Sequence, residues 1–249
     1  LKLPIVFFFL MYGLITLAQT SARINSFNII QNSDQVLQFK STFRQRSIHA
    51  ESITTSSGTF SELQVDGFGS SNVVGEPKLP VLKQLIEVPL DAEFDVELVN
   101  YTVNEYNLAE LGVTFPIIPA QEPVSKSADP SKIEFIYNKA TYANNSFLAH
   151  KLVDVIPVGI MRSVRVARLE IAPVLYNPVE NKVQVYENIE VRIHYRNANR
   201  SKTAELKEET YSPYFEASYR MFANHQADET RTNLTRYPVK YVIVSDPMF

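Results

Sequence analysis

Apolar and polar residues alternate with a period of two over most of residues 36–195. The clearest case is residues 189–195, where every odd-numbered residue is apolar and every even-numbered residue is polar. Successive side chains of a β-strand point to opposite faces, so this pattern predicts a strand with one face in a core and the other in water. Residues 183–186 alternate in the same way just before it.

Further alternating runs are separated by clusters of Gly, Pro, Asn, Asp and Ser, which are typical of turns between strands. The predicted strands cover residues 36–43, 59–65, 81–88, 94–103, 133–137, 152–158 and 168–171. The turn-forming stretch 177–181 predicts an antiparallel hairpin that ends in residues 183–186. Many short strands with little helix predict a mainly β fold, an antiparallel and jelly-roll-like β-sandwich over residues 23–196.

The C-terminal part changes character. Residues 197–236 are largely polar and predict a linker, interrupted by a short amphipathic helix over residues 213–223 that starts at a Ser-Pro pair. Residues 237–249 form a nearly continuous apolar run before a Ser-Asp-Pro stop. Such a run is typical of the first buried strand of an α/β domain, so we expect a truncated second domain to begin there.

The N-terminus carries one lysine followed by an apolar run over residues 3–18. This pattern predicts a secretory signal peptide over residues 1–18, cleaved after Ala18 or, alternatively, after Ala22. A membrane anchor is the other interpretation, but the run is shorter than the roughly 20 residues that a spanning helix needs. We therefore expect export to the periplasm, cell surface or exterior, with no stable membrane span after signal removal.

Composition excludes several classes of function. The chain has 249 residues, of which 45% are hydrophobic and 20% are charged, as in ordinary folded proteins. A net charge of −3 gives no reason to expect a nucleic-acid partner. The absence of cysteine excludes a cysteine nucleophile and a thiolate metal site, and it leaves stability to a packed core without disulfides.

No pattern of catalytic residues stands out. The four histidines, His49, His150, His194 and His225, show no His-Glu-x-x-His spacing, and no Gly-x-Ser-x-Gly elbow occurs. His194 falls on the polar face of its predicted strand, which favours a surface histidine. The sequence thus predicts no catalytic residue, no metal site and no cofactor, and it favours a binding or folding module.

Two motifs lie in the β-rich region. In the first, Gly75 is followed by Pro77, Leu79 and Pro80 at the entry to a predicted strand. Proline fixes its own φ and restricts the residue before it, so this motif predicts a rigid, extended entry to a sheet.

The second motif starts at Arg162 and runs through Pro173 to the turn residues Tyr176, Asn177 and Pro178, then into the closing strand. Both motifs resemble the pro-region of gingipain-type peptidases, which are exported bacterial cysteine proteases with a caspase-like catalytic domain. The order of signal, β-rich segment, polar linker and apolar strand is similar to theirs as well.

This resemblance implies an intramolecular chaperone and latency inhibitor, whose partner is the caspase-like peptidase domain of the same precursor. The chain itself would not be catalytic, because the catalytic Cys and His would lie outside it. Ser163 departs from the family, which commonly has glycine after the arginine.

In this family a basic side chain on a prodomain loop enters the specificity pocket of the peptidase. The candidates nearest to that loop are Lys132 and Lys139, and each also fits an ordinary surface lysine. For processing, Arg236 followed by Tyr237 resembles the junction at which the family releases its catalytic domain, with Arg231 as a second basic residue. Both arginines also fit a solvated linker.

Two alternatives stay open from the sequence. The composition equally permits an exported β-sandwich module for adhesion or carbohydrate binding. The chain also fits a relative of the peptidases in which the pro-region is retained rather than removed.

Overall fold

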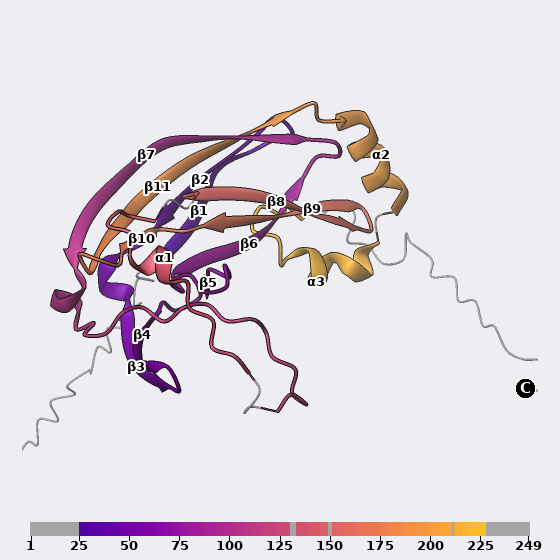
Figure 1. Cartoon of the computed structure of the whole chain (residues 1–249). Helices are drawn as coiled ribbons and strands as arrows, with labels where there is room; N and C mark the ends of the chain where they lie inside the picture. Colours follow the sequence, from indigo (N-terminus) through magenta and orange to yellow (C-terminus); the bar gives the residue numbers. More distant parts are fainter. Residues whose placement is uncertain (1–24, 130–132, 149–150, 211, 228–249) are drawn as a thin grey trace, which may run out of the picture.

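Two antiparallel sheets packed face to face form the body of the protein (Figure 1). The computed structural model describes residues 25–129, 133–148, 151–210 and 212–227. The five-stranded sheet contains β1 (Ser26–Asn32), β2 (Val36–Thr42), β7 (Glu93–Asn107), β10 (Val174–Asn177) and β11 (Lys182–Arg196). The four-stranded sheet contains β5 (Gly69–Ser70), β6 (Pro80–Val88), β8 (Val153–Met161) and β9 (Val164–Ile171). A separate hairpin contains β3 (His49–Thr55) and β4 (Gly58–Gln64). The prediction of a mainly β, antiparallel sandwich is confirmed.

The core lies between the two sheets and follows the alternation along β11. Ile189, Val191 and Ile193 are fully buried. They belong to one cluster with Ile86 of β6 and Leu169 of β9, on the opposite sheet. Burial of this continuous apolar layer is the main source of stability, since the chain has no disulfides.

The two runs predicted at residues 183–186 and 189–195 belong to one long strand. Between them the register with β7 shifts after Glu187, and Asn188 adopts a left-handed φ of 52°. A second shift follows between Glu190 and Val191, where β7 carries the extra residue. The two shifts compensate, so the strand stays continuous and its buried residues remain at odd-numbered positions on both sides. The polar residues Glu187 and Asn188 interrupt the alternation in the sequence, which therefore predicts two strands where the backbone forms one.

The prediction of a strand at residues 133–137 is wrong. These residues form no strand in the structure. Their backbone is held instead by the side chain of Gln121 and, just beyond, by the carbonyl of Gly75. Local alternation fits a strand, but no neighbouring strand offers this segment a ladder of hydrogen bonds.

The predicted linker over residues 197–236 contains more structure than expected. It forms helix α2 (Arg200–Thr210), the 3-10 turn η4 (Pro213–Phe215) and helix α3 (Glu216–Tyr219), which is shorter than the helix predicted over 213–223. Helix α2 has no buried residue and no apolar stripe, so no period-3.6 pattern of apolar residues indicated a helix there. None of the helices in the described ranges is long and apolar enough to cross a membrane.

Residues 212–227, here named the C-terminal clasp, cover the outer face of the four-stranded sheet. Val164 and Val166 point away from the main core and pack with Tyr219 and Phe222 in a separate cluster. The backbone N–H of Ala223 donates to the carbonyl of Leu85 on β6, with an N···O distance of 2.8 Å. Strand β9 is therefore buried on both faces at this end.

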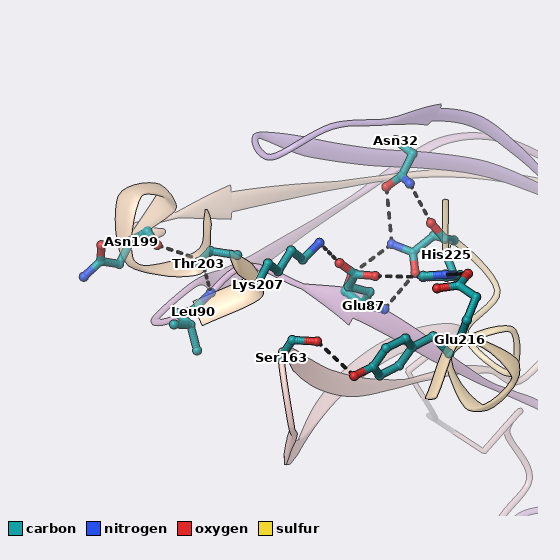
Figure 2. Close-up of polar contacts among 11 residues, drawn as sticks. Asn32, Glu87, Leu90, Ser163, Asn199, Thr203, Lys207, Glu216 and His225 are labelled. Atoms are coloured by element: carbon teal, nitrogen blue, oxygen red, sulfur yellow. Dashed lines mark hydrogen bonds and ion pairs between the residues drawn. The ribbon is translucent and has the colours of Figure 1, made fainter. Parts of the chain in front are cut away.

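The turn between β8 and β9 also contacts the clasp. The guanidinium of Arg162, which has a φ of 52°, lies 4.1 Å from the ring centroid of Phe215. The hydroxyl of Ser163 donates to the hydroxyl of Tyr219 at 3.0 Å (Figure 2). Ser163 thus gives the clasp a buried hydrogen bond.

Glu87 of β6 is the centre of a polar network between the sheet, helix α2 and the clasp (Figure 2). Its carboxylate accepts from Lys207, whose pKa is lowered by burial, and lies 3.4 Å from Nδ1 of His225. Nε2 of His225 lies 2.8 Å from Glu216 of α3. The clasp is therefore held by polar as well as apolar contacts.

Residues 1–18, the predicted signal peptide, lie outside the described residues, as do residues 237–249, the predicted first strand of a second domain. Both stay predictions.

Replacing Ile193 by alanine is expected to lower the free energy of unfolding by about 2–5 kcal/mol, because the side chain is fully buried. The matched control is Ile30→Ala on β1, where 54% exposure predicts a change of less than about 0.5 kcal/mol. Urea denaturation of both variants measures the difference. Equal losses would contradict the placement of the core.

Replacing Tyr219 by alanine is expected to release the clasp without unfolding the sandwich, because Tyr219 lies in a cluster separate from the main core. Amide hydrogen exchange should then speed up at Ala223 and leave β11 protected. Tyr214→Ala is the control, since Tyr214 is 55% exposed in the same segment. Equal loss of protection in β11 would show that the clasp belongs to the cooperative core.

Candidate functional site

A long loop leaves the sandwich between β7 and β8 and projects away from the sheets (Figure 1). It follows the 3-10 turn η2 (Leu108–Leu111), and residues 121–129 are all exposed. We name residues 121–129 and 133–135 the projecting loop, with residues 117–120 as its first arm and residues 136–142 as its second arm. Its exposure suits contact with another protein surface.

One side chain closes the base of the projecting loop. Nε2 of Gln121 donates to the carbonyl of Ile136 at 2.8 Å, and Oε1 of Gln121 accepts from the N–H of Ile136 at 2.9 Å. A carboxamide that hydrogen-bonds both the N–H and the carbonyl of one residue acts like the pair of hydrogen bonds that a neighbouring strand would provide. The two arms are therefore held side by side where the loop begins and ends.

Gly75, from the first family motif, bonds both arms. Its N–H donates to the carbonyl of Ala120 at 2.8 Å, and its carbonyl accepts from the N–H of Asn138 at 3.0 Å. Its φ is +82°, and a Cβ at this position would lie 3.3 Å from the nitrogen of Asn138. Only glycine combines this backbone conformation with so close an approach.

The rest of this motif joins the first arm to the core. Pro77 is buried and pairs with Pro119 in an isolated antiparallel bridge. Leu79 is buried in the second core cluster, and its N–H donates to the hydroxyl of Ser71. Pro80 then begins β6, a position where proline is tolerated in a strand.

Aromatic side chains hold the second arm and helix α1 (Lys139–Tyr142). Phe60 of β4 contacts the rings of Phe135 and Tyr137, and Tyr137 stacks on Tyr142 with a centroid distance of 4.3 Å. The hydroxyl of Tyr142 donates to the carbonyl of Ile117 on the first arm, and burial raises the pKa of Tyr142. The second arm is thus attached to the β3–β4 hairpin through Phe60 and to the first arm through Tyr142.

The second family motif supports the chain that returns from α1. Tyr176 of β10 is buried, and its carbonyl accepts from the N–H of Leu148 at 3.0 Å. Its hydroxyl donates to Oδ1 of Asn181 at 3.3 Å, and burial raises its pKa to about 12. Pro173, just before β10, accepts from the N–H of Tyr186 through its carbonyl.

Asn177 shapes the turn after β10, which includes Pro178. Its Oδ1 accepts from the N–H groups of Val179 and Glu180, an arrangement typical of an Asx turn. Its Nδ2 donates to Oδ1 of Asn145 at 3.1 Å. The Tyr-Asn-Pro stretch therefore fixes both the hairpin and the segment beyond the projecting loop.

The structure describes one of the two predicted inhibitory lysines. Lys139 is exposed at the start of α1, at the base of the loop, whereas Lys132 lies outside the described residues. Lys126, which the sequence analysis missed, is exposed on the projecting loop. The polar, non-periodic stretch 119–131 was the signal that could have included it.

The processing candidates Arg231, Arg236 and Tyr237 lie outside the described residues. In the part of the chain that the structure describes, no group of three or more His, Cys, Asp or Glu side chains is placed to hold a metal ion. His194 is half-exposed and contacts Glu97, as expected for the polar face of its strand.

The family model described as Propeptide_C25 matches residues 21–232. A Lys-gingipain of Porphyromonas gingivalis is 34% identical over 212 residues, which cover 85% of this chain but 12% of that protein. A gingipain R1 of the same organism is 28% identical over 153 residues, which cover 61% of this chain and 14% of that protein. The chain therefore spans only a small part of these relatives.

Two solved structures share the fold. One, described as giving insight into the zymogenic latency of gingipain K from Porphyromonas gingivalis, has a TM-score of 0.64 and 32% identity and covers 72% of this chain and 96% of that chain. The other, a complex of the pro- and mature domains of Porphyromonas gingivalis RgpB, has a TM-score of 0.62 and 21% identity. It covers 81% of this chain and 99% of that chain. Together with the family match over residues 21–232, these likenesses show that the chain belongs to the Propeptide_C25 family, the propeptides of gingipain-type cysteine peptidase precursors.

Proposed function

We propose that this propeptide keeps the peptidase domain of its own precursor latent by placing the projecting loop in the substrate cleft. The observation that carries this proposal is the exposed loop whose two arms are held by Gln121, Gly75 and Tyr142. Arms that are already fixed lose little conformational entropy on binding, so contacts made by the loop between them translate more fully into affinity. The family and its structurally similar prodomains support this function over an adhesion or carbohydrate-binding module.

A lysine on or beside the loop is the group that would enter the specificity pocket. A pocket that selects lysine or arginine presents negative charge, which a basic side chain can neutralise in a desolvated contact. The similar protein named Lys-gingipain favours lysine as the selected residue. The candidates are Lys126, Lys132 and Lys139.

We also propose that the propeptide assists the folding of its peptidase domain. The sandwich has its own core shared by both sheets and can form before the following domain. A folded surface placed beside a growing domain would stabilise the native state of that domain by binding it and not its unfolded form. Export would precede this action, and the catalytic residues would belong to the following domain.

If one lysine fills the pocket, its replacement by alanine is expected to raise the inhibition constant of the isolated propeptide at least about 30-fold, the cost of breaking a buried charge pair. Titration of the cognate peptidase with the variants Lys126→Ala, Lys132→Ala and Lys139→Ala measures this. Lys202→Ala is the matched control, since Lys202 is exposed on helix α2. No change in any of the three loop variants would argue against the lysine contact, and no inhibition by the wild-type propeptide would end the proposal of latency.

The processing site is tested on the full-length precursor. We expect the mature form to begin at Tyr237, because exposed chain between two folded domains is open to a protease. N-terminal sequencing should show this terminus disappear in Arg236→Ala and persist in Arg231→Ala. An unchanged terminus in Arg236→Ala would refute the site, and a mature form that still carries the sandwich would instead show a retained pro-region.

A further inference from the structure

The projecting loop divides the chain into two segments that do not form separate domains. Before it come β1 to β7, and after it come β8 to β11. The five-stranded sheet pairs β11 with both β2 and β7, and the four-stranded sheet pairs β9 with β6. Both sheets of the sandwich are therefore built from both segments.

The cores are shared in the same way. The larger cluster joins Phe39 and Ile86 from the first segment to Leu169 and Ile193 from the second. The second cluster joins Leu79 and others of the first segment to Tyr176 and its neighbours on β10 and β11. Neither segment alone can bury the apolar faces of its strands, so each depends on the other for its fold.

Both ends of the loop would remain attached if the loop were cut. The first arm is held by bonds of Ala120 and Ile118 to the Gly75 motif and to Ser61. The second arm is held by the Phe60 ring contacts and by the Asn138 N–H bond to Gly75. Hydrolysis of one peptide bond consumes a water and leaves a carboxylate and an ammonium group, and both would lie in exposed chain with no cost of burying charge.

We infer that cleavage within residues 121–129 leaves the propeptide assembled as two interlocked fragments that still inhibit, so that a cut in the loop is not the step that releases the peptidase. Only the inhibition part rests on the proposed function. An effective concentration in the millimolar range and a folding equilibrium constant of at least about 10⁴ give a dissociation constant of the fragments below about 10⁻⁷ M. Release then requires disruption of the sandwich or of its contacts with the peptidase.

The test introduces one cleavable site and leaves all native residues in place. The recognition sequence of a site-specific viral protease is inserted between Ser127 and Ala128, since insertions in an exposed loop are well tolerated. After complete cleavage, denaturing electrophoresis should show two fragments, while size-exclusion chromatography should show one peak at the volume of the uncut variant. The inhibition constant should rise less than about tenfold on cleavage, the cost of ordering one or two freed side chains.

Gln121→Ala in the same insertion variant provides the contrast. Without the contacts of Gln121 with Ile136, cleavage should weaken inhibition much more than in the parent, while the fragments still elute together. Gln31→Ala is the matched control, because Gln31 is exposed on β1 far along the chain from the loop. It should behave like the parent.

Separation of the two fragments on the column would overturn the inference. So would a single peak combined with a loss of inhibition above about a hundredfold on cleavage. If the uncut variant and the wild-type propeptide both fail to inhibit, the proposed function fails, and the elution of the cut protein still decides whether the fragments interlock. Should the insertion prevent folding, the same recognition sequence in place of residues 123–129 repeats the elution test.

Discussion

The pairing of β11 with strands on both of its edges is the interaction on which the rest of the structure depends. One edge pairs with β7 along its length, and the other pairs first with β10 and then with β2. Its buried residues Ile189, Val191 and Ile193 face the other sheet. Since β7 leads into the projecting loop, this pairing also fixes the strand from which the loop starts, whereas the strand that follows the loop, β8, pairs with β9 in the other sheet. A chain without cysteine has no covalent alternative to this arrangement.

The residues of the two motifs serve attachment rather than chemistry. Gly75 bonds both arms of the loop, and Tyr176 and Asn177 fix the segment that returns from it. Arg162 instead packs on Phe215 of the clasp, at the other attachment on the sandwich. Such positions hold two irregular segments, a loop and a chain end, in defined places on a regular scaffold. This division suits the proposed role in latency, because inhibition by a bound loop would need rigidity more than reactive groups.

The clasp is attached to the sandwich by apolar and polar contacts. Its apolar contacts with Val164 and Val166 are reinforced by the network of Glu87, Lys207 and His225. A polar network that is partly buried is specific in geometry, since each member has few other partners. The position of the clasp on the sandwich is therefore fixed by side chains on three separate elements.

The sequence by itself determined the fold class and the strand positions with strong alternation, because period-two burial and proline or glycine constraints act locally. The family was indicated by the resemblance of two motifs. The sequence did not determine helix α2, whose helical state depends on contacts of Thr203 and Lys207 with Leu90 and Glu87 rather than on an apolar stripe. It also misplaced a strand at residues 133–137, where alternation was present but a partner strand was not. For the candidate site, the sequence indicated the two motifs and a loop with basic residues. It did not indicate that the first motif and both arms of the loop lie in contact. Gly75 and Asn138 are far apart along the chain, and only the packing of the sandwich brings their backbones into contact.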